Sequence, residues 1–210
     1  MAERKVALFG GTFDPIHLGH TAVAGAAAAH IGADKIIFIP AKCSPLKDSL
    51  PSASDDDRLA MIALAIADNK KFQLDDYELK KKEASYTLET VRRFQAQFGS
   101  DTSLYWLVGA DSVGELQYWY RIAELIDVCN LCVMYRAGYK PPDFIRFESI
   151  WGSDCVEKLQ RNVIQTPLID ISSTEIRNRL AAGLDVSDKL TPRVADYIHK
   201  HGLYQSEAEY

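Results

Sequence analysis

Short apolar runs alternate with longer stretches of helical periodicity between residues 5 and 135. Five apolar runs have the length of buried strands: KVALFG at 5–10, KIIFIP at 35–40, FQL at 72–74, SLYWLV at 103–108 and NLCVMY at 130–135. The stretch 18–31 between the first two runs is rich in alanine and ends before Gly32, a residue typical of a helix C-terminus. The pattern predicts repeated strand–helix units.

Two further helices are predicted between the second and fourth runs. The first begins with three aspartates, where the helix dipole favours negative charge. Its expected apolar face consists of Leu59, Ile62, Ala63 and Ile66. The second helix covers about 86–98, with Leu88, Val91, Phe94 and Phe98 on one side.

The C-terminal part of the chain is expected to be helical. Ser172 and Glu175 have the spacing of a capping box, with Gly183 near the end of the helix that they start. Thr191 before Pro192 has the pattern of an N-cap and first helical position, and Gly202 ends that second helix.

Alternating strands and helices predict a Rossmann-like α/β fold, with a mostly parallel sheet and helices on both faces. Ligands of such folds bind beyond the carboxyl ends of the strands. Gly10, Pro40, Gly109 and Arg136 each follow a predicted strand, so their loops should meet at one edge. We interpret residues 1–210 as a single domain, with 172–210 as its C-terminal helical extension.

Composition and charge narrow the range of partners. Of the 210 residues 47% are hydrophobic, and the formal net charge is −5. This charge argues against polymeric nucleic acid and anionic membrane as partners, so any phosphate site should be local. No apolar run has the length of a membrane span and no signal peptide is evident, which predicts a cytoplasmic protein. A homo-oligomer is compatible with the sequence.

The four cysteines are interpreted as free thiols. Cys129 and Cys132 form a C-x-x-C pattern, but within a strand two residues three apart point to opposite faces. Such a pair is poorly placed to hold one metal ion or to form a disulfide bond. Both are therefore predicted to be small buried side chains.

The segment GGTFDPIHLGH at 10–20 joins the first strand to the first helix and combines several features suited to phosphate. Gly10 and Gly11 lack side-chain bulk, the helix start offers N–H groups, and His17 and His20 share one helical face. Half of a zinc site is the alternative for the histidines, but the segment brings no further ligand with the right spacing. The loop also lacks the G-x-G-x-x-G order of dinucleotide-binding folds.

The segment ISSTEIR at 171–177 is the second candidate for anion binding. Its capping spacing alone is ordinary, but Arg177 lies near the positive end of the predicted helix. A bound anion would remove this unfavourable arrangement. An arginine side chain that reaches into water is the alternative.

Together these segments closely resemble the paired signatures of adenylyltransferases with the H-x-G-H nucleotidyltransferase fold. More narrowly, the chain resembles the bacterial nicotinate-nucleotide adenylyltransferases over nearly its whole length. The similarity continues in PAKCSPLK at 40–47, SYT at 85–87, GAD at 109–111, WY at 119–120, RAGY at 136–139 and YIHKHGLY at 197–204. Two departures lie in loops: Ser44 and Ala137 stand where the family commonly has proline.

The resemblance implies transfer of AMP from ATP to nicotinate mononucleotide, which gives deamido-NAD and pyrophosphate. His17, His20 and Arg177 would be catalytic, with His20 the main candidate for stabilising the transition state. The residues expected around ATP and its phosphates are Gly10, Gly11, Thr12, Phe13, Lys47, Asp111, Arg136, Ser173 and Thr174. Mg²⁺ would be held by phosphates and water, with no ligand from the protein.

The resemblance also places the nicotinate ring on Trp119, with backbone amides near Thr87 and Tyr120 facing its carboxylate. From the residues alone, Trp119 and Tyr120 could equally be core aromatics, and Asp111 could be a helix N-cap. Two other functions are open: the same chemistry on another phosphorylated acceptor, such as pantetheine phosphate, and a nucleotide sensor that binds ATP without turnover.

Overall fold

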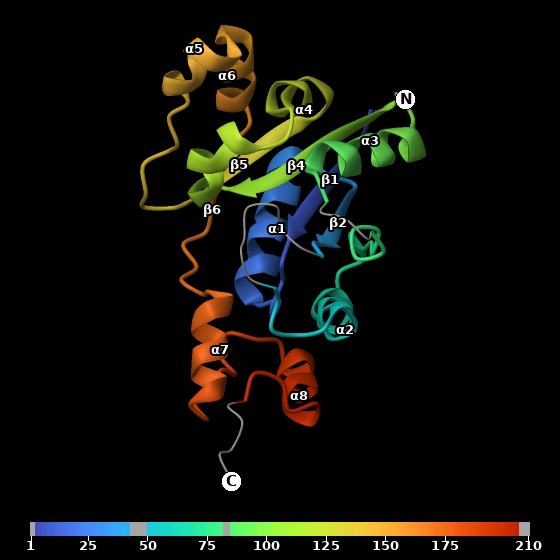
Figure 1. Cartoon of the computed structure of the whole chain (residues 1–210), viewed down its shortest axis with the longest axis vertical. Coiled ribbons are helices and arrows are strands. Elements are labelled where there is room, and N and C mark those ends of the chain that lie inside the picture. The colour runs from blue at the N-terminus through green and yellow to red at the C-terminus, as the bar shows by residue number, and fades with distance from the viewer. Residues whose placement is uncertain (1–2, 43–49, 82–84, 206–210) are drawn as a thin grey trace.

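A computed structural model describes residues 3–42, 50–81 and 85–205 of the chain (Figure 1). Within these ranges six strands form one sheet in the order β3-β2-β1-β4-β5-β6, and each neighbouring pair is parallel. The strands are β1 (Arg4–Gly11), β2 (Lys35–Pro40), β3 (Phe72–Leu74), β4 (Thr102–Gly109), β5 (Asn130–Arg136) and β6 (Val163–Thr166). The Rossmann-like parallel sheet is therefore confirmed.

Helices cover both faces of the sheet. They are α1 (Leu18–Ile31), α2 (Asp55–Ile66), α3 (Thr87–Phe98), α4 (Ile122–Val128), α5 (Glu148–Trp151), α6 (Ser153–Arg161), α7 (Ser173–Ala181) and α8 (Pro192–Lys200), with 3-10 helices η1 (Ala110–Tyr118) and η2 (Ile145–Phe147). Figure 1 shows α7 and α8 together at one end, away from α5 and α6. None of the helices within the described ranges is long and apolar enough to cross a membrane.

Alternate residues of β1 enter two separate apolar cores, as expected for a parallel sheet buried on both faces. Ala7 and Phe9 pack with α1, α2, α7 and α8 residues on one face. Val6 and Leu8 pack with residues of α3, α4 and α6 on the other. Continuous apolar runs, without polar alternation, are the sequence pattern that this double burial produces.

Helix α1 lies close to the sheet because alanines form its inner face. Ala24 and Ala27 are completely buried, and Gly32 ends the helix with a φ of 69°. A residue with a Cβ atom rarely adopts this left-handed conformation. The predicted helix and its glycine stop are both confirmed.

Helix α2 begins where predicted, with the Ser54 hydroxyl accepting the Asp57 N–H at 3.1 Å. Its predicted apolar face was partly wrong. Arg58 is completely buried, whereas Ala63 is exposed. The guanidinium of Arg58 can occupy the interior because carbonyl and carboxylate oxygens surround it there, and a periodicity reading cannot detect such partners.

The cysteine prediction is confirmed for Cys129, Cys132 and Cys155, which are free thiols, whereas Cys43 lies outside the described residues. Cys129 and Cys132 are both buried, and they belong to the cores on opposite faces of the sheet. Burial raises the pKa of each thiol to about 12, with the neighbouring Cys132 adding to the effect at Cys129. Neither sulfur is available as a thiolate at neutral pH.

The C-terminal helices are confirmed and attach to the N-terminal half of the chain. Ser172 caps α7 by accepting the Glu175 N–H at 3.1 Å. Thr191 is the N-cap residue of α8, although its hydroxyl makes no hydrogen bond. Tyr197 of α8 donates to Asp57 of α2 at 2.9 Å. The backbone N–H of Leu18, at the start of α1, donates to the Lys189 carbonyl at 3.0 Å.

We predict that Ala27→Leu destabilises the protein by about 1–3 kcal/mol, because the added methylenes must fit into a filled core between α1 and the sheet. Urea unfolding would measure the change. Ala29→Leu, at an exposed position of the same helix, is the matched control and should change stability by less than about 0.5 kcal/mol. Equal stability of the two variants would contradict close packing of α1 on the sheet.

Candidate active site

The order of the strands reverses between β1 and β4, and in open parallel sheets ligands bind at such a point. A cavity of about 300 Å³ lies here. Its floor contains the end of β1 with the following residue, 9–12, and the end of β4, 106–109. The sequence had predicted that the loops after these strands meet at one edge, and the cavity confirms it.

Neighbouring aromatic rings leave no room for a side chain at Gly10 or Gly11. A Cβ atom at Gly10 would lie 2.5 Å from the indole of Trp106, and one at Gly11 would lie 2.9 Å from the ring of Phe13. Real Cβ atoms do not approach other atoms this closely. The two glycines therefore let aromatic side chains pack directly beneath the cavity, in addition to exposing backbone on its floor.

His17 and His20 stack with 3.7 Å between their ring centroids. The backbone N–H of His17 donates to Nδ1 of His20 at 3.3 Å. Because Nδ1 accepts this bond, the proton of a neutral His20 ring belongs on Nε2, which becomes a hydrogen-bond donor. Gly19 makes room for the pair, since a Cβ atom there would lie 2.9 Å from Nδ1 of His17.

Both imidazoles are neutral at pH 7. Burial, and then the nearby charge of Arg136, lower the pKa of His17 to about 4. Burial, and then His17, hold the pKa of His20 well below its usual value. Among the described residues, Nδ1 of His17 is buried without a hydrogen-bond partner. Within the same part of the chain no group of three His, Cys, Asp or Glu side chains is placed to hold a metal ion.

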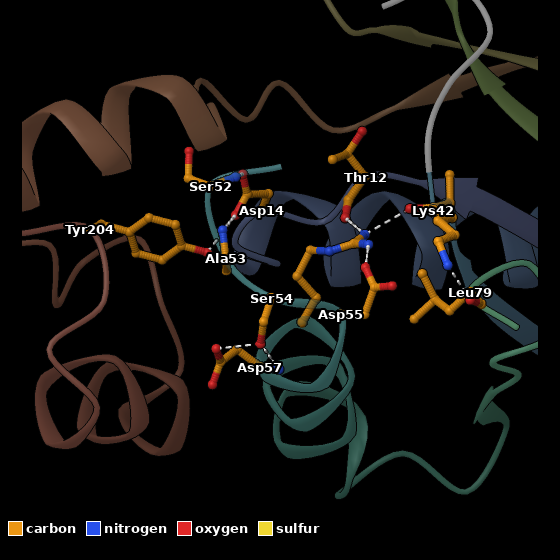
Figure 2. A network of polar contacts seen from close by, with 12 residues as sticks. Thr12, Asp14, Lys42, Ser52, Ala53, Ser54, Asp55, Asp57, Leu79 and Tyr204 are labelled. Carbon is orange, nitrogen blue, oxygen red and sulfur yellow. Dashed lines mark hydrogen bonds and ion pairs between the residues drawn. The ribbon is translucent and has the colours of Figure 1, made fainter. Parts of the chain in front are cut away.

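The loop after β1 is held from one side by Arg58 of α2. Its Nη1 donates to the carbonyls of Thr12 and Ala41, at 2.7 and 2.9 Å, and its Nη2 pairs with Asp55 at 2.6 Å. Figure 2 shows Thr12 and Asp55 on opposite sides of this group of hydrogen bonds. The sequence reading did not identify Arg58, because an arginine on a helix normally faces water.

Helix α7 holds the same loop from the other side. Nη1 of Arg177 donates to the Asp14 carbonyl at 2.6 Å, and the Ser173 hydroxyl donates to the Pro15 carbonyl at 2.9 Å. Thr174 accepts a weaker bond from Arg177 at 3.4 Å. The alternative of an arginine reaching into water is thus wrong: the two signature segments, from opposite ends of the chain, are in direct contact.

The carboxylate of Asp14 is a second organising group that the sequence reading missed. It is 4% exposed and accepts the backbone N–H groups of Ser52 and Ala53 at 2.7 and 3.1 Å. The hydroxyl of Tyr204 also donates to it, at 2.7 Å. Figure 2 shows Asp14 at the meeting point of three chain segments. An acidic residue inside the signature segment at 10–20 was the available signal, but its partners are distant in sequence.

The residues expected to bind the acceptor line the other side of the cavity. Thr87, Trp119 and Tyr120 are all in its wall. Trp119 also packs against the apolar core on the α3 side of the sheet, as its core alternative expects, whereas Tyr120 is exposed. The ring of Tyr86 packs against that of Tyr120, with 4.7 Å between centroids. The cavity therefore has an aromatic wall, built by α3 and by the segment after η1.

Two buried polar side chains in this wall were not predicted. Burial raises the pKa of Glu78, and the Thr90 hydroxyl donates to its carboxyl group at 2.7 Å. Ser85 is also buried, and its hydroxyl has no hydrogen-bond partner among residues 3–42, 50–81 and 85–205. Glu78 gave no sequence signal, because its partner Thr90 is in the next helix.

The remaining predicted residues lie outside the cavity wall or outside the described residues. Arg136 is about half exposed, at 3.6 Å from Asp170. Asp111 is exposed and lies inside η1, whose N-cap is Gly109, so its N-cap alternative is wrong. His17, His20 and Arg177 do not line the cavity, and neither does Phe13, whose ring packs against that of His20 with 5.0 Å between centroids. Lys47 and Ser44 lie outside the described residues.

Ala137, which stands where the family commonly has proline, has a structural role. Its N–H donates to the Thr166 carbonyl at 2.9 Å and extends the contact between β5 and β6. Proline has no N–H group and could not make this bond. Alanine at this position therefore allows a hydrogen bond that fixes the start of the loop after Arg136.

Comparison with known proteins agrees with this geometry. The sequence model described as cytidylyltransferase-like matches residues 8–179, which is most of the chain. The chain therefore belongs to the cytidylyltransferase-like family of nucleotidyltransferases.

Individual relatives narrow the assignment. A probable nicotinate-nucleotide adenylyltransferase of Neisseria gonorrhoeae is 40% identical over 202 residues, covering 96% of this chain and 99% of the relative. One from Pectobacterium atrosepticum is 37% identical over 209 residues, covering 95% and 98%. Within the family, the chain belongs to the nicotinate-nucleotide adenylyltransferases.

A solved structure supports the fold independently. The nicotinic acid mononucleotide adenylyltransferase of Plasmodium falciparum, complexed with NaAD, superimposes with a TM-score of 0.73 at 20% identity. The match covers 96% of this chain and 97% of that one. Its fold is thus shared over almost the full length, despite the low identity.

We predict that the free protein loses stability as the pH falls from 6.5 toward 5, in part through His17. An unfolded histidine binds a proton near pH 6.5, whereas buried His17 stays neutral down to about pH 4. The unfolded state therefore takes up more protons in this window, which favours unfolding by up to about 1.4 kcal/mol per pH unit. Urea titrations at several pH values would measure the slope.

His17→Asn should flatten that slope, because the amide does not titrate. His30→Asn, at an exposed position near the other end of α1, is the matched control and should keep the wild-type slope. A slope that is unchanged in His17→Asn would contradict the buried, neutral state of this ring.

Proposed function

We propose that this enzyme transfers AMP from ATP to nicotinate mononucleotide, giving deamido-NAD and pyrophosphate as a step in NAD biosynthesis. The observation that carries the proposal is the contact between the two signature segments. Arg177 and Ser173 of α7 bind the same loop that ends in the stacked pair of His17 and His20. The names of the relatives and the acceptor-side cavity support the choice of substrates. We assign the reaction to the cytoplasm.

The proposed chemistry needs positioning and charge stabilisation. The 5′-phosphate of the acceptor is already an anion at pH 7, so it can attack the α-phosphorus of ATP without a general base. Pyrophosphate leaves from the side of the α-phosphorus opposite to the attacking phosphate. The increase in negative charge on the reacting oxygens then requires donors that are already in place.

His20 fits this task as a neutral donor. Its Nδ1 is occupied by the His17 N–H, which leaves Nε2–H for a phosphate oxygen. A neutral ring avoids the cost of a buried charge while the site is empty. Arg177 and Arg136 supply positive charge nearby, with Ser173 and Thr174 at the start of α7. Gly10, Gly11 and Thr12 lie in the cavity floor, and Phe13, Lys47 and Asp111 remain proposed contacts to ATP.

Mg²⁺ is proposed to enter with the triphosphate. The ion would be held mainly by phosphates and water, as it usually is beside nucleotides. The Asp14 carboxylate in the loop already accepts bonds from Ser52, Ala53 and Tyr204. When bound, the ion would neutralise phosphate charge.

The acceptor is proposed to occupy the 300 Å³ cavity. Trp119 would stack on the nicotinate ring, and amides near Thr87 and Tyr120 would receive its carboxylate. An arrangement of N–H donors favours a carboxylate over a carboxamide, because the amide group of the carboxamide places its own donors against them.

We predict that His20→Ala lowers kcat by ~10²-fold or more, which is the usual effect of removing one transition-state donor. Pyrophosphate release at saturating substrates would measure it. His30→Ala, on the exposed end of the same helix, is the control and should keep wild-type turnover. Near-normal turnover of His20→Ala would exclude His20 from the mechanism.

Trp119→Ala is predicted to raise KM for nicotinate mononucleotide by at least ~10-fold, with ATP binding little changed, because the variant loses one aromatic stacking surface in the acceptor wall. Calorimetry with each substrate separately would test this. Trp151→Ala is a suitable control, since that indole stacks on Phe147 away from the cavity. A large loss of ATP affinity in Trp119→Ala would contradict the assignment.

The wild-type assay separates the competing functions. Pyrophosphate release with nicotinate mononucleotide, and much less with nicotinamide mononucleotide or pantetheine phosphate, is the expected result. Faster release with pantetheine phosphate would establish the other acceptor. ATP binding without pyrophosphate release from any of the three would indicate a nucleotide sensor.

A further inference from the structure

Tyr204, after the last helix, is held in an unusual backbone conformation. Its φ of 62° lies in the left-handed region, which a residue with a large side chain rarely adopts. Such conformations persist only where surrounding contacts enforce them. Here the contact is the phenol hydroxyl, which donates to Oδ1 of Asp14 at 2.7 Å across 190 positions of sequence.

The carboxylate that receives this bond is buried and fully engaged. Oδ2 accepts the Ser52 N–H, and Oδ1 accepts both the Ala53 N–H and the Tyr204 hydroxyl. A buried carboxylate needs several donors to offset its lost hydration. Burial and the neighbouring Asp14 raise the pKa of Tyr204, so the phenol remains a donor over the whole physiological pH range.

Asp14 connects this bond to the phosphate side of the site. Its own carbonyl accepts Nη1 of Arg177, whose Nη1 also lies 3.9 Å from the Asp14 carboxylate. The preceding residue, Phe13, has a φ of 49°. Its ring packs edge-on against the ring of His20, with 5.0 Å between the ring centroids. A shift of Asp14 would therefore move both the guanidinium of Arg177 and the support of His20.

We propose that Tyr204 is a positioning residue for ATP: its hydroxyl fixes Asp14, and through Asp14 the loop and the arginine that face the triphosphate. The hydroxyl donates to Asp14 and acts on the site only through the loop that this carboxylate fixes. The inference rests on the proposed function, in that it takes ATP as the ligand of this loop. The C-terminal turn after α8 would thus help to position ATP, although its sequence indicates only the end of a helix.

Tyr197 provides a matched control. It is on α8, it is partly buried, and its hydroxyl donates to the carboxylate of Asp57 at 2.9 Å. Tyr197→Phe thus removes a tyrosine–aspartate hydrogen bond that also attaches the C-terminal part of the chain to the N-terminal half. Asp57 lies on α2, and its hydrogen bonds within the described residues go to Ser54 and Tyr197 instead of the loop at 12–17, so this variant measures the structural loss alone.

The experiment compares Tyr204→Phe with Tyr197→Phe in the full-length protein. We expect both variants to be folded at the assay temperature, with Tyr204→Phe melting at the lower temperature because Asp14 is more deeply buried than Asp57. Tyr204→Phe should weaken binding of a non-hydrolysable ATP analogue by about 5- to 10-fold and raise KM for ATP to a similar extent, since a bond to a charged group is lost. Affinity for nicotinate mononucleotide should change by less than about 2-fold. Tyr197→Phe should leave ATP-analogue affinity at the wild-type value.

Equal ATP-analogue affinity in the two variants, or equal weakening of both substrates in Tyr204→Phe, would overturn the inference. Binding of the analogue is measured without turnover, so the result is independent of the acceptor. If the wild type fails to use nicotinate mononucleotide but Tyr204→Phe still weakens the analogue selectively, the proposed acceptor is wrong and the positioning role stands.

Discussion

The hydrogen bonding of one short loop, residues 12–17, fixes the proposed phosphate side of the site. Its carbonyl oxygens at Thr12, Asp14 and Pro15 accept bonds from Arg58, Arg177 and Ser173. Buried backbone groups must find such partners, and a loop has no ladder of its own to supply them. Side chains from two distant helices supply them here, so the loop is fixed by the folding of the rest of the chain.

This arrangement explains how a protein of negative net charge can bind a polyanionic substrate. The net charge of −5 gives no general attraction for phosphate, so binding depends on local groups. Burial keeps His17 and His20 neutral, which avoids isolated buried charge while the site is empty. Arg177 is already oriented by Asp14 before any ligand arrives. Preorganisation of this kind reduces the reorganisation that charge stabilisation would otherwise require.

The two sides of the site depend on different parts of the fold. The phosphate side combines the loop after β1 with α7 and the C-terminal turn. The acceptor side combines the end of β4 with α3 and the segment after η1, where an aromatic wall contains buried Glu78. They meet over Gly10 and Gly11, whose missing side chains let Trp106 and Phe13 pack beneath both. In the proposed reaction the phosphates of both substrates would meet above this floor.

The sequence by itself determined the features with a local cause. Apolar runs predicted five strands, glycine and capping patterns predicted the bounds of α1 and α7, and two signature segments indicated the family. Helices α4, α5 and α6 and strand β6 were missed because short elements depend on tertiary packing. Only the tertiary structure decided that Asp14, Arg58 and Tyr204 hold the site, since a buried polar group is stable only beside partners that the folded chain brings to it.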